Sequence, residues 1–170
     1  KNSQPSNAMV KGLISQFIVR FRRITHFNST LTTGTSSRTW FAEGNGHTYF
    51  NANVELGSNS LNTFEEGVTF DESNSHPHGH FTLTYGPNSR TEVTGGTGNY
   101  DDIVLQTGAS VIFNNRNGGS SNTFHDVTLT SFNTIELTAD RETYVDGTFT
   151  ADVDCDEWAI IRSSIQGNQA

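Results

Sequence analysis

The sequence predicts an all-β protein, specifically a closed antiparallel barrel of eight strands. Strand-forming Thr, Phe, Val and Ile and turn-forming Asn and Gly are abundant, whereas the helix formers Ala, Leu and Lys are scarce. Apolar and polar residues alternate through several segments, which is typical of strands with one buried face. Turns, rather than helical crossovers, separate these segments. A long antiparallel sheet tends to close, because closure removes its exposed edges.

The strands are expected in the order of the alternating segments, and no internal repeat is expected. In the first segment one face is apolar, with Phe17 and Val19, and the other is mixed, with Ile18 and Arg20; Phe50 and Val54 share one face of the second segment. Gly86-Pro87-Asn88 has the chemistry of a turn that ends a strand. The expected strands are 13–27, 38–56, 63–71, 81–85, 91–94, 103–114, 124–138 and 143–153, with 158–165 as a short final strand or helix.

Composition limits the range of functions. The formal net charge of -8 argues against a nucleic-acid or anionic-membrane surface, because both need basic patches. No apolar run is long enough to span a membrane. Cys155 is the single cysteine, so no intrachain disulfide can form, and its acidic neighbours disfavour a reactive thiolate. We expect a cytoplasmic protein with one domain over 9–170, and residues 1–8 to be a tag remnant or disordered.

A glycine-rich stretch, Thr94-Gly95-Gly96-Thr97-Gly98, lies between two expected strands. A phosphate-binding loop needs a helix after its glycines, and here acidic residues and a further strand follow instead. The stretch is therefore interpreted as a corner of the barrel. The pair Asp101-Asp102 is expected to cap this corner in solvent.

The segment from Asn62 to Gly108 resembles the barrels of allene oxide cyclases and dirigent proteins. The resemblance rests on 64–70 (FEEGVTF), on Gly79-His80-Phe81, and on the glycine corner followed by Tyr100. It implies an eight-stranded barrel with a mainly apolar central cavity, no cofactor, and assembly into homodimers or homotrimers. Small barrels of similar shape act as Diels–Alderases. The resemblance thus implies a cofactor-independent cyclase or isomerase that folds a reactive, apolar polyketide- or terpenoid-like intermediate. A non-catalytic dirigent-like protein that guides a coupling is the alternative.

Candidate site residues follow from the faces of the expected strands. Glu66 shares a face with Phe64 and Phe70; inside a cavity its carboxylate would have a raised pKa suited to acid–base catalysis, and outside it would pack in an oligomer. Tyr85 and Tyr49 are expected to donate hydrogen bonds to a substrate carbonyl. The expected substrate-binding residues are Trp40, Phe64, Phe70, Phe81 and Leu83.

No metal site is expected, although one motif keeps a metal alternative open. His76, His78 and His80 alternate and could chelate an ion in a cupin-like enzyme. Pro77 and Gly79 break strand geometry, which favours an ordinary turn instead.

Overall fold

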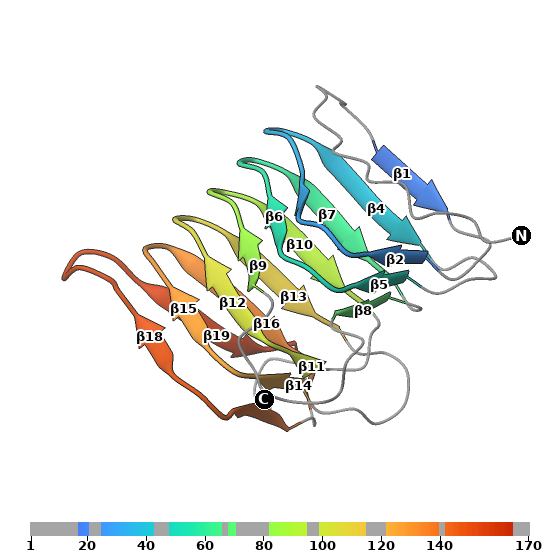
Figure 1. The fold of residues 1–170 in the computed structure, drawn as a ribbon. Coiled ribbons are helices and arrows are strands. Elements are labelled where there is room, and N and C mark those ends of the chain that lie inside the picture. The colour runs from blue at the N-terminus through green and yellow to red at the C-terminus, as the bar shows by residue number, and fades with distance from the viewer. Residues whose placement is uncertain are drawn as a thin grey trace, which may run out of the picture.

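The computed structural model describes residues 17–20, 25–42, 48–65, 68–70, 82–94, 99–114, 122–139 and 142–164. These residues form a parallel β-solenoid, with strands and no helix. Each coil contributes one strand to each of three walls and then turns sharply into the next coil. Figure 1 shows the coils stacked from the N-terminal strands, in blue, to the C-terminal strands, in red.

The first wall, sheet A, runs the length of the solenoid. Its seven strands lie in the order in which they occur along the chain. They are β1 (Phe17–Arg20), β4 (Arg38–Ala42), β7 (Leu61–Phe64), β10 (Arg90–Val93), β13 (Ser110–Phe113), β16 (Asn133–Leu137) and β19 (Ala159–Ser163).

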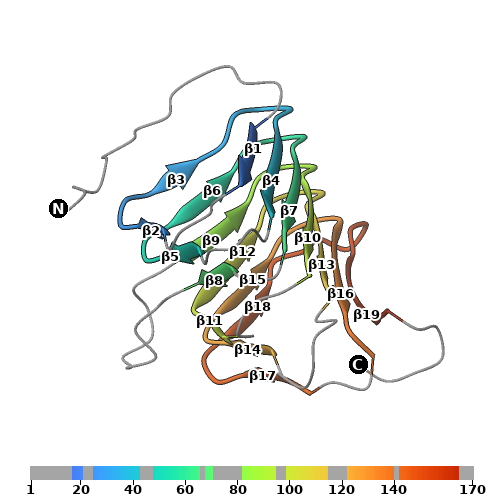
Figure 2. The same ribbon diagram turned by 90° about the vertical axis from the view of Figure 1, so that its right-hand side faces the viewer.

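The second wall is formed by two short sheets. Sheet B contains β2 (Thr25–Phe27), β5 (Thr48–Phe50) and β8 (Val68–Phe70), and sheet D contains β11 (Asn99–Tyr100), β14 (Asn122–Phe124) and β17 (Thr143–Val145). The third wall, sheet C, has six strands: β3 (Leu31–Thr32), β6 (Val54–Leu56), β9 (Thr82–Tyr85), β12 (Asp102–Leu105), β15 (Val127–Leu129) and β18 (Phe149–Ala151). Figure 2 shows sheets A and C as two walls that meet at the top, with sheets B and D below.

The prediction of a closed antiparallel barrel is wrong. Every pairing among the described strands is parallel, and each strand pairs with its counterpart one coil later. The long strands expected from the sequence are broken by corners: 38–56 contains β4, β5 and β6, and 124–138 runs from the last residue of β14 through β15 and β16. Buried residues keep the same alternation across some of these corners, as between Phe50 and Val54 and between Leu129 and Asn133, which is why those segments resembled single strands.

A tight turn between sheets C and A recurs in successive coils. One residue of each turn has a left-handed backbone: φ is 56° at Ser36, 53° at Asn59, 53° at Asn88, 74° at Gly108 and 60° at Phe132. The residue before the turn packs on the previous coil. A Cβ on Gly86 would lie 2.1 Å from the backbone oxygen of Leu56, so only glycine fits there. The predicted turn at Gly86-Pro87-Asn88 therefore exists, but it joins two walls instead of two paired strands.

Aromatic rings fill the N-terminal half of the interior. The Phe27, Phe50 and Phe70 rings stack at successive coils, with centroids 5.0 and 5.5 Å apart. Phe41 and Phe64 stack on each other at 5.2 Å and meet this column edge-on. Burial of a phenylalanine side chain contributes about 1.5–3 kcal/mol, so these columns are a main source of stability.

Asn133, the first residue of β16, is a polar residue in the interior of the solenoid. Its amide nitrogen donates to the carbonyl of Gln106 at 2.9 Å, and its side-chain oxygen accepts from the backbone nitrogen of Thr130 at 2.6 Å. The residue is fully buried. It therefore joins two coils through a side chain that has no access to water.

Candidate metal centre

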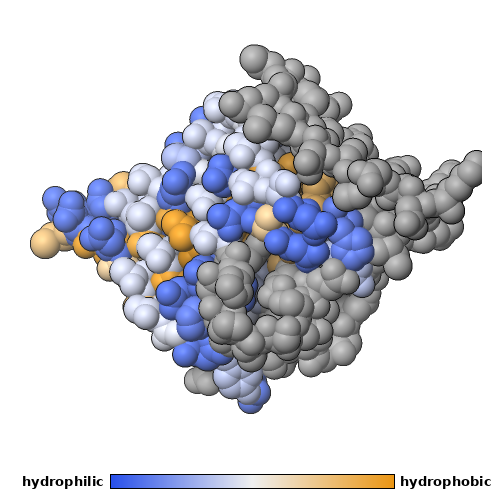
Figure 3. Space-filling view, in the orientation of Figure 1, coloured by the Kyte–Doolittle hydropathy of each residue, from blue (hydrophilic) through white to orange (hydrophobic). Residues whose placement is uncertain are grey.

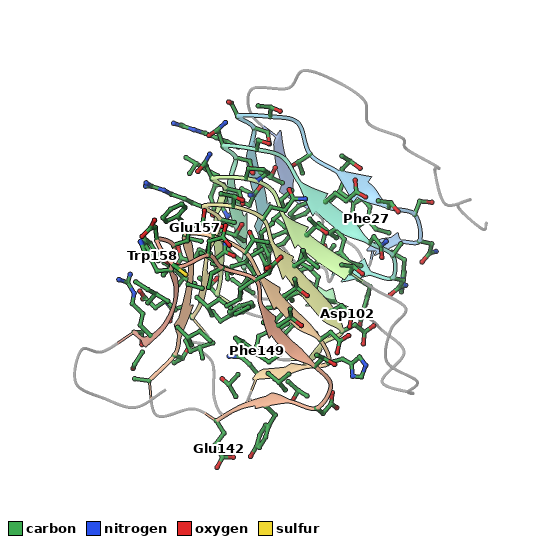
Figure 4. All side chains as sticks on the ribbon, turned by 90° about the vertical axis from the view of Figure 1, so that its left-hand side faces the viewer. Phe27, Asp102, Glu142, Phe149, Glu157 and Trp158 are labelled. Carbon is green, nitrogen blue, oxygen red and sulfur yellow. The ribbon has the colours of Figure 1, made fainter. Side chains whose placement is uncertain are left out.

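A cluster of carboxylates and one imidazole lies at the corner between sheets D and C. Asp102 begins β12, His125 and Asp126 lie between β14 and β15, and Asp146 directly follows β17. Because Ile103 pairs with Val127, the parallel register places Asp102 and Asp126 at equivalent positions of neighbouring coils. Figure 4 shows Asp102 at this corner, outside the packed interior.

Hydrogen bonds between coils hold the two carboxylates in place. Asp102 Oδ1 accepts from the backbone nitrogen of Asp126 at 3.3 Å, and Asp126 Oδ1 accepts from that of Thr148 at 2.6 Å. Asn53 makes the same bond to Thr82, at 2.9 Å, in an earlier coil. Asp102 and Asp126 thus make the bond between coils that Asn53 makes with its amide oxygen. The second carboxylate oxygen of each aspartate can then bind another group.

His125 is oriented by Asp146. Its Nδ1 lies 3.1 Å from Asp146 Oδ1, and its Nε2 lies 3.9 Å from Asp126 Oδ1. The hydrogen bond with Asp146 raises the pKa of His125, and the charges of Asp126 and Asp102 act in the same direction against a smaller effect of desolvation. The side chains of His125, Asp126 and Asp146 are 31%, 43% and 44% exposed, so an ion from solution can reach them.

The geometry suits a metal ion better than it suits a buried catalytic pair. One ligand atom each from Asp102, His125 and Asp126 lies within 4.8 Å of the others. An ion about 2.1 Å from each ligand needs ligand atoms no more than about 4.2 Å apart, which small rotations of exposed side chains provide. When Nδ1 carries the proton of the hydrogen bond to Asp146, Nε2 bears a lone pair and lies 3.9 Å from Asp126 Oδ1. Metal-binding histidines are commonly oriented by a carboxylate in this way.

Most of the site residues expected from the sequence lie elsewhere in the fold. Phe64, Phe70, Leu83 and Tyr85 are at most 1% exposed and form part of the packed interior. Burial raises the pKa of the Tyr85 hydroxyl well above its ordinary value. The structure therefore brings those four side chains together in the same packed core.

Two expected site residues point outward. Trp40 and Tyr49 are partly exposed on β4 and β5, and the Tyr49 ring stacks on His26 at 4.8 Å. Further predicted features fall outside the described residues: Glu66, Phe81, the histidine motif 76–80 and the glycine corner 95–98.

The sequence reasoning missed three members of the cluster. Asp102 was expected only to cap a corner in solvent, and His125, Asp126 and Asp146 were not singled out. Their spacing was the available signal: Asp102 and Asp126 are 24 residues apart, and His125 and Asp146 are 21 apart. Both spacings equal one coil of this solenoid.

No protein-family model matches the chain, and neither a curated protein nor a solved structure matches it. None of the described segments is a long apolar helix of the kind that crosses a bilayer. These comparisons bear neither for nor against the resemblance to allene oxide cyclases and dirigent proteins. The outer surface of the solenoid is therefore the place where a function can be sought.

Proposed function

We propose that the protein binds a divalent transition-metal ion, such as Zn²⁺, at the corner formed by Asp102, His125 and Asp126. The observation that carries the proposal is the bond between His125 Nδ1 and Asp146, which orients the imidazole with Nε2 3.9 Å from Asp126 Oδ1, in a cluster that Asp102 completes. Imidazole favours Zn²⁺ and its neighbours in the first transition row, whereas an all-carboxylate site favours Ca²⁺ or Mg²⁺. Three protein ligands leave at least one coordination position open to water or to a further ligand.

The ion would join two coils of the solenoid. Asp102 belongs to the coil of β12, and His125 and Asp126 belong to the next coil. It would also offset the repulsion between the neighbouring carboxylates of an acidic chain. Because the folded chain arranges these ligands, a free ion concentration of about 100 times Kd would stabilise the fold by about 2.7 kcal/mol.

We place the protein in the cytoplasm, because the exposed, unpaired Cys155 suits a reducing compartment.

Calorimetric titration of the chelator-treated protein tests the proposal. We expect one Zn²⁺ per chain, with Ca²⁺ bound far more weakly. Substitution of a ligand, as in Asp102→Asn or His125→Gln, removes the binding. The matched control Asp152→Asn changes an exposed acidic residue outside the cluster and leaves the affinity unchanged.

A second pair of variants separates this site from the histidine motif. Asp146→Asn should weaken binding by about 10–100-fold, because it removes the group that orients the imidazole. His78→Gln changes the motif 76–80 and leaves the affinity unchanged. Zinc binding that survives His125→Gln and is lost in His78→Gln would refute the corner site.

A further inference from the structure

At the C-terminal end of the solenoid, apolar side chains are exposed at positions that are buried one coil earlier. Val145, Phe149 and Ile161 are 38%, 48% and 48% exposed. They pair one coil back with Phe124, Val127 and Ile135, which are only 2–3% exposed. Figure 4 looks onto this end and shows Phe149 within the outline of the last coil, and Figure 3 shows apolar residues reaching the surface over the C-terminal coils. The last described coil thus presents an apolar face.

The same end presents strand edges. Among the described strands, β17, β18 and β19 are the terminal strands of sheets D, C and A, and each pairs with one neighbour. At the opposite end, β1, β2 and β3 are the terminal strands of sheets A, B and C. Unpaired strand edges bind other strands through their backbone groups. The two ends therefore present terminal strands of the same three walls.

Charge distinguishes the two ends. The described residues 17–20 and 25–42, which include β1, β2 and β3, contain two Arg and no Asp or Glu. The described residues 142–164, which include β17, β18 and β19, contain six Asp and Glu and one Arg. Strands β1 and β2 lie at one end of the stack in Figure 1, and β18 lies at the other end. Two C-terminal ends would repel each other, whereas a C-terminal end and an N-terminal end attract.

We propose that the C-terminal end of one molecule stacks head to tail on the N-terminal end of a second copy. The contact continues the walls of the solenoid from one molecule into the next and covers Phe149 and Ile161. Such a contact is heterologous and leaves one free end on each side, so it produces open chains of molecules instead of a closed dimer. It does not depend on the proposed metal ion, whose ligands lie on the side of the stack.

The test is the molar mass in solution, measured by light scattering over a wide range of concentration. We expect a mass that rises with concentration from the 18.6 kDa of one chain past that of a dimer. High salt should reduce the mass, because it screens the attraction between the ends. A mass that stays at one chain, or that stops at two, overturns the proposal.

Variants that block one end each give a sharper result. Phe149→Asp blocks the C-terminal end, and Leu31→Asp, on β3, blocks the N-terminal end. Each is expected to be monomeric alone, and their mixture should form one-to-one dimers through the remaining pair of free ends. The controls Tyr144→Asn and Thr32→Asn change exposed neighbours without adding charge and leave the assembly intact.

Circular dichroism confirms that each variant is folded. Where Leu31→Asp does not fold, Arg20→Glu combined with Arg38→Glu reverses the charge carried by β1 and β4 and takes its place. A mixture of blocked variants that remains monomeric overturns the head-to-tail arrangement.

Discussion

Replacement of Phe50 by alanine tests the direction in which the strands of sheet B face. Phe50 is fully buried, and its ring lies 5.0–5.9 Å from the rings of Phe27, Phe41, Phe64 and Phe70. Removal of a core phenylalanine costs about 3–5 kcal/mol, because the apolar contacts are lost and a cavity remains. In a chain of this size each kcal/mol lowers Tm by about 2–4 °C, so a decrease of about 6–20 °C is expected.

The neighbouring residue Tyr49 is the matched control. It lies on the same strand, points outward and makes a stacking contact with His26 at 4.8 Å. Loss of one such aromatic pair costs at most about 1.5 kcal/mol. Thermal and urea unfolding of both variants, followed by circular dichroism, measures the difference. If Tyr49→Ala destabilises the protein more than Phe50→Ala, the assignment of inner and outer faces is wrong.

Three further substitutions test other parts of the structure. Tyr85→Phe should leave stability unchanged or raise it by up to about 1 kcal/mol, because the buried hydroxyl has no hydrogen-bond partner among the described residues; a loss in urea unfolding would contradict this. Asn133→Ala should cost about 1–3 kcal/mol in the same assay, since it removes the hydrogen bonds of a buried amide and takes the acceptor away from the Thr130 backbone nitrogen; a neutral result would show that this nitrogen finds another partner. Asp146→Asn should lower the pKa of His125, seen in an NMR titration, because their hydrogen bond is the largest cause of the raised value; an unchanged pKa would remove Asp146 from its orienting role.

The sign of the His125 shift fixes its effect on metal binding and on stability. A raised pKa means that the folded chain holds the proton more tightly than the unfolded chain. The stabilising effect is therefore fully present below the unfolded pKa of about 6.5 and is lost as pH rises through the folded value. A metal ion needs neutral Nε2, so Zn²⁺ affinity should increase over the same pH range. Titration calorimetry at several pH values measures this, and an affinity independent of pH would argue against an imidazole ligand.

The sequence predicted which residues form strands but not how the strands pair. Scarce helix formers and alternating apolar residues indicated strands, and the described residues form strands and no helix. Alternation has the same period in parallel and antiparallel sheets, so it cannot distinguish a solenoid from a barrel. Gly86-Pro87-Asn88 suits a hairpin and a corner equally well. The fold prediction failed at that ambiguity, and the solenoid places Phe64 and Tyr85 in its packed interior.

The repeat was hidden by the unequal length of the coils. Leu61 pairs with Arg90, 29 residues later, whereas Arg90 pairs with Ser110, 20 residues later. A search at one fixed period does not detect such a pattern. The repeat can instead be recognised from the recurring turn. Glycine, asparagine and serine occupy the same positions in Gly57-Ser58-Asn59-Ser60 and in Gly86-Pro87-Asn88-Ser89. These positions are under physical constraint, because the turn needs a left-handed residue and a close approach between coils.

The stacking of coils also explains where a site can arise in this protein. Side chains far apart in sequence become neighbours when they occupy the same position of successive coils, as Asp102 and Asp126 do. In the column that contains them, Asn53 bonds to the next coil as an amide, and aspartate makes the same bond while adding charge. One substitution at such a position therefore keeps the structural bond and creates a ligand. The metal centre that we propose needs only this change in two adjacent coils, together with a histidine beside it that the following coil orients through Asp146.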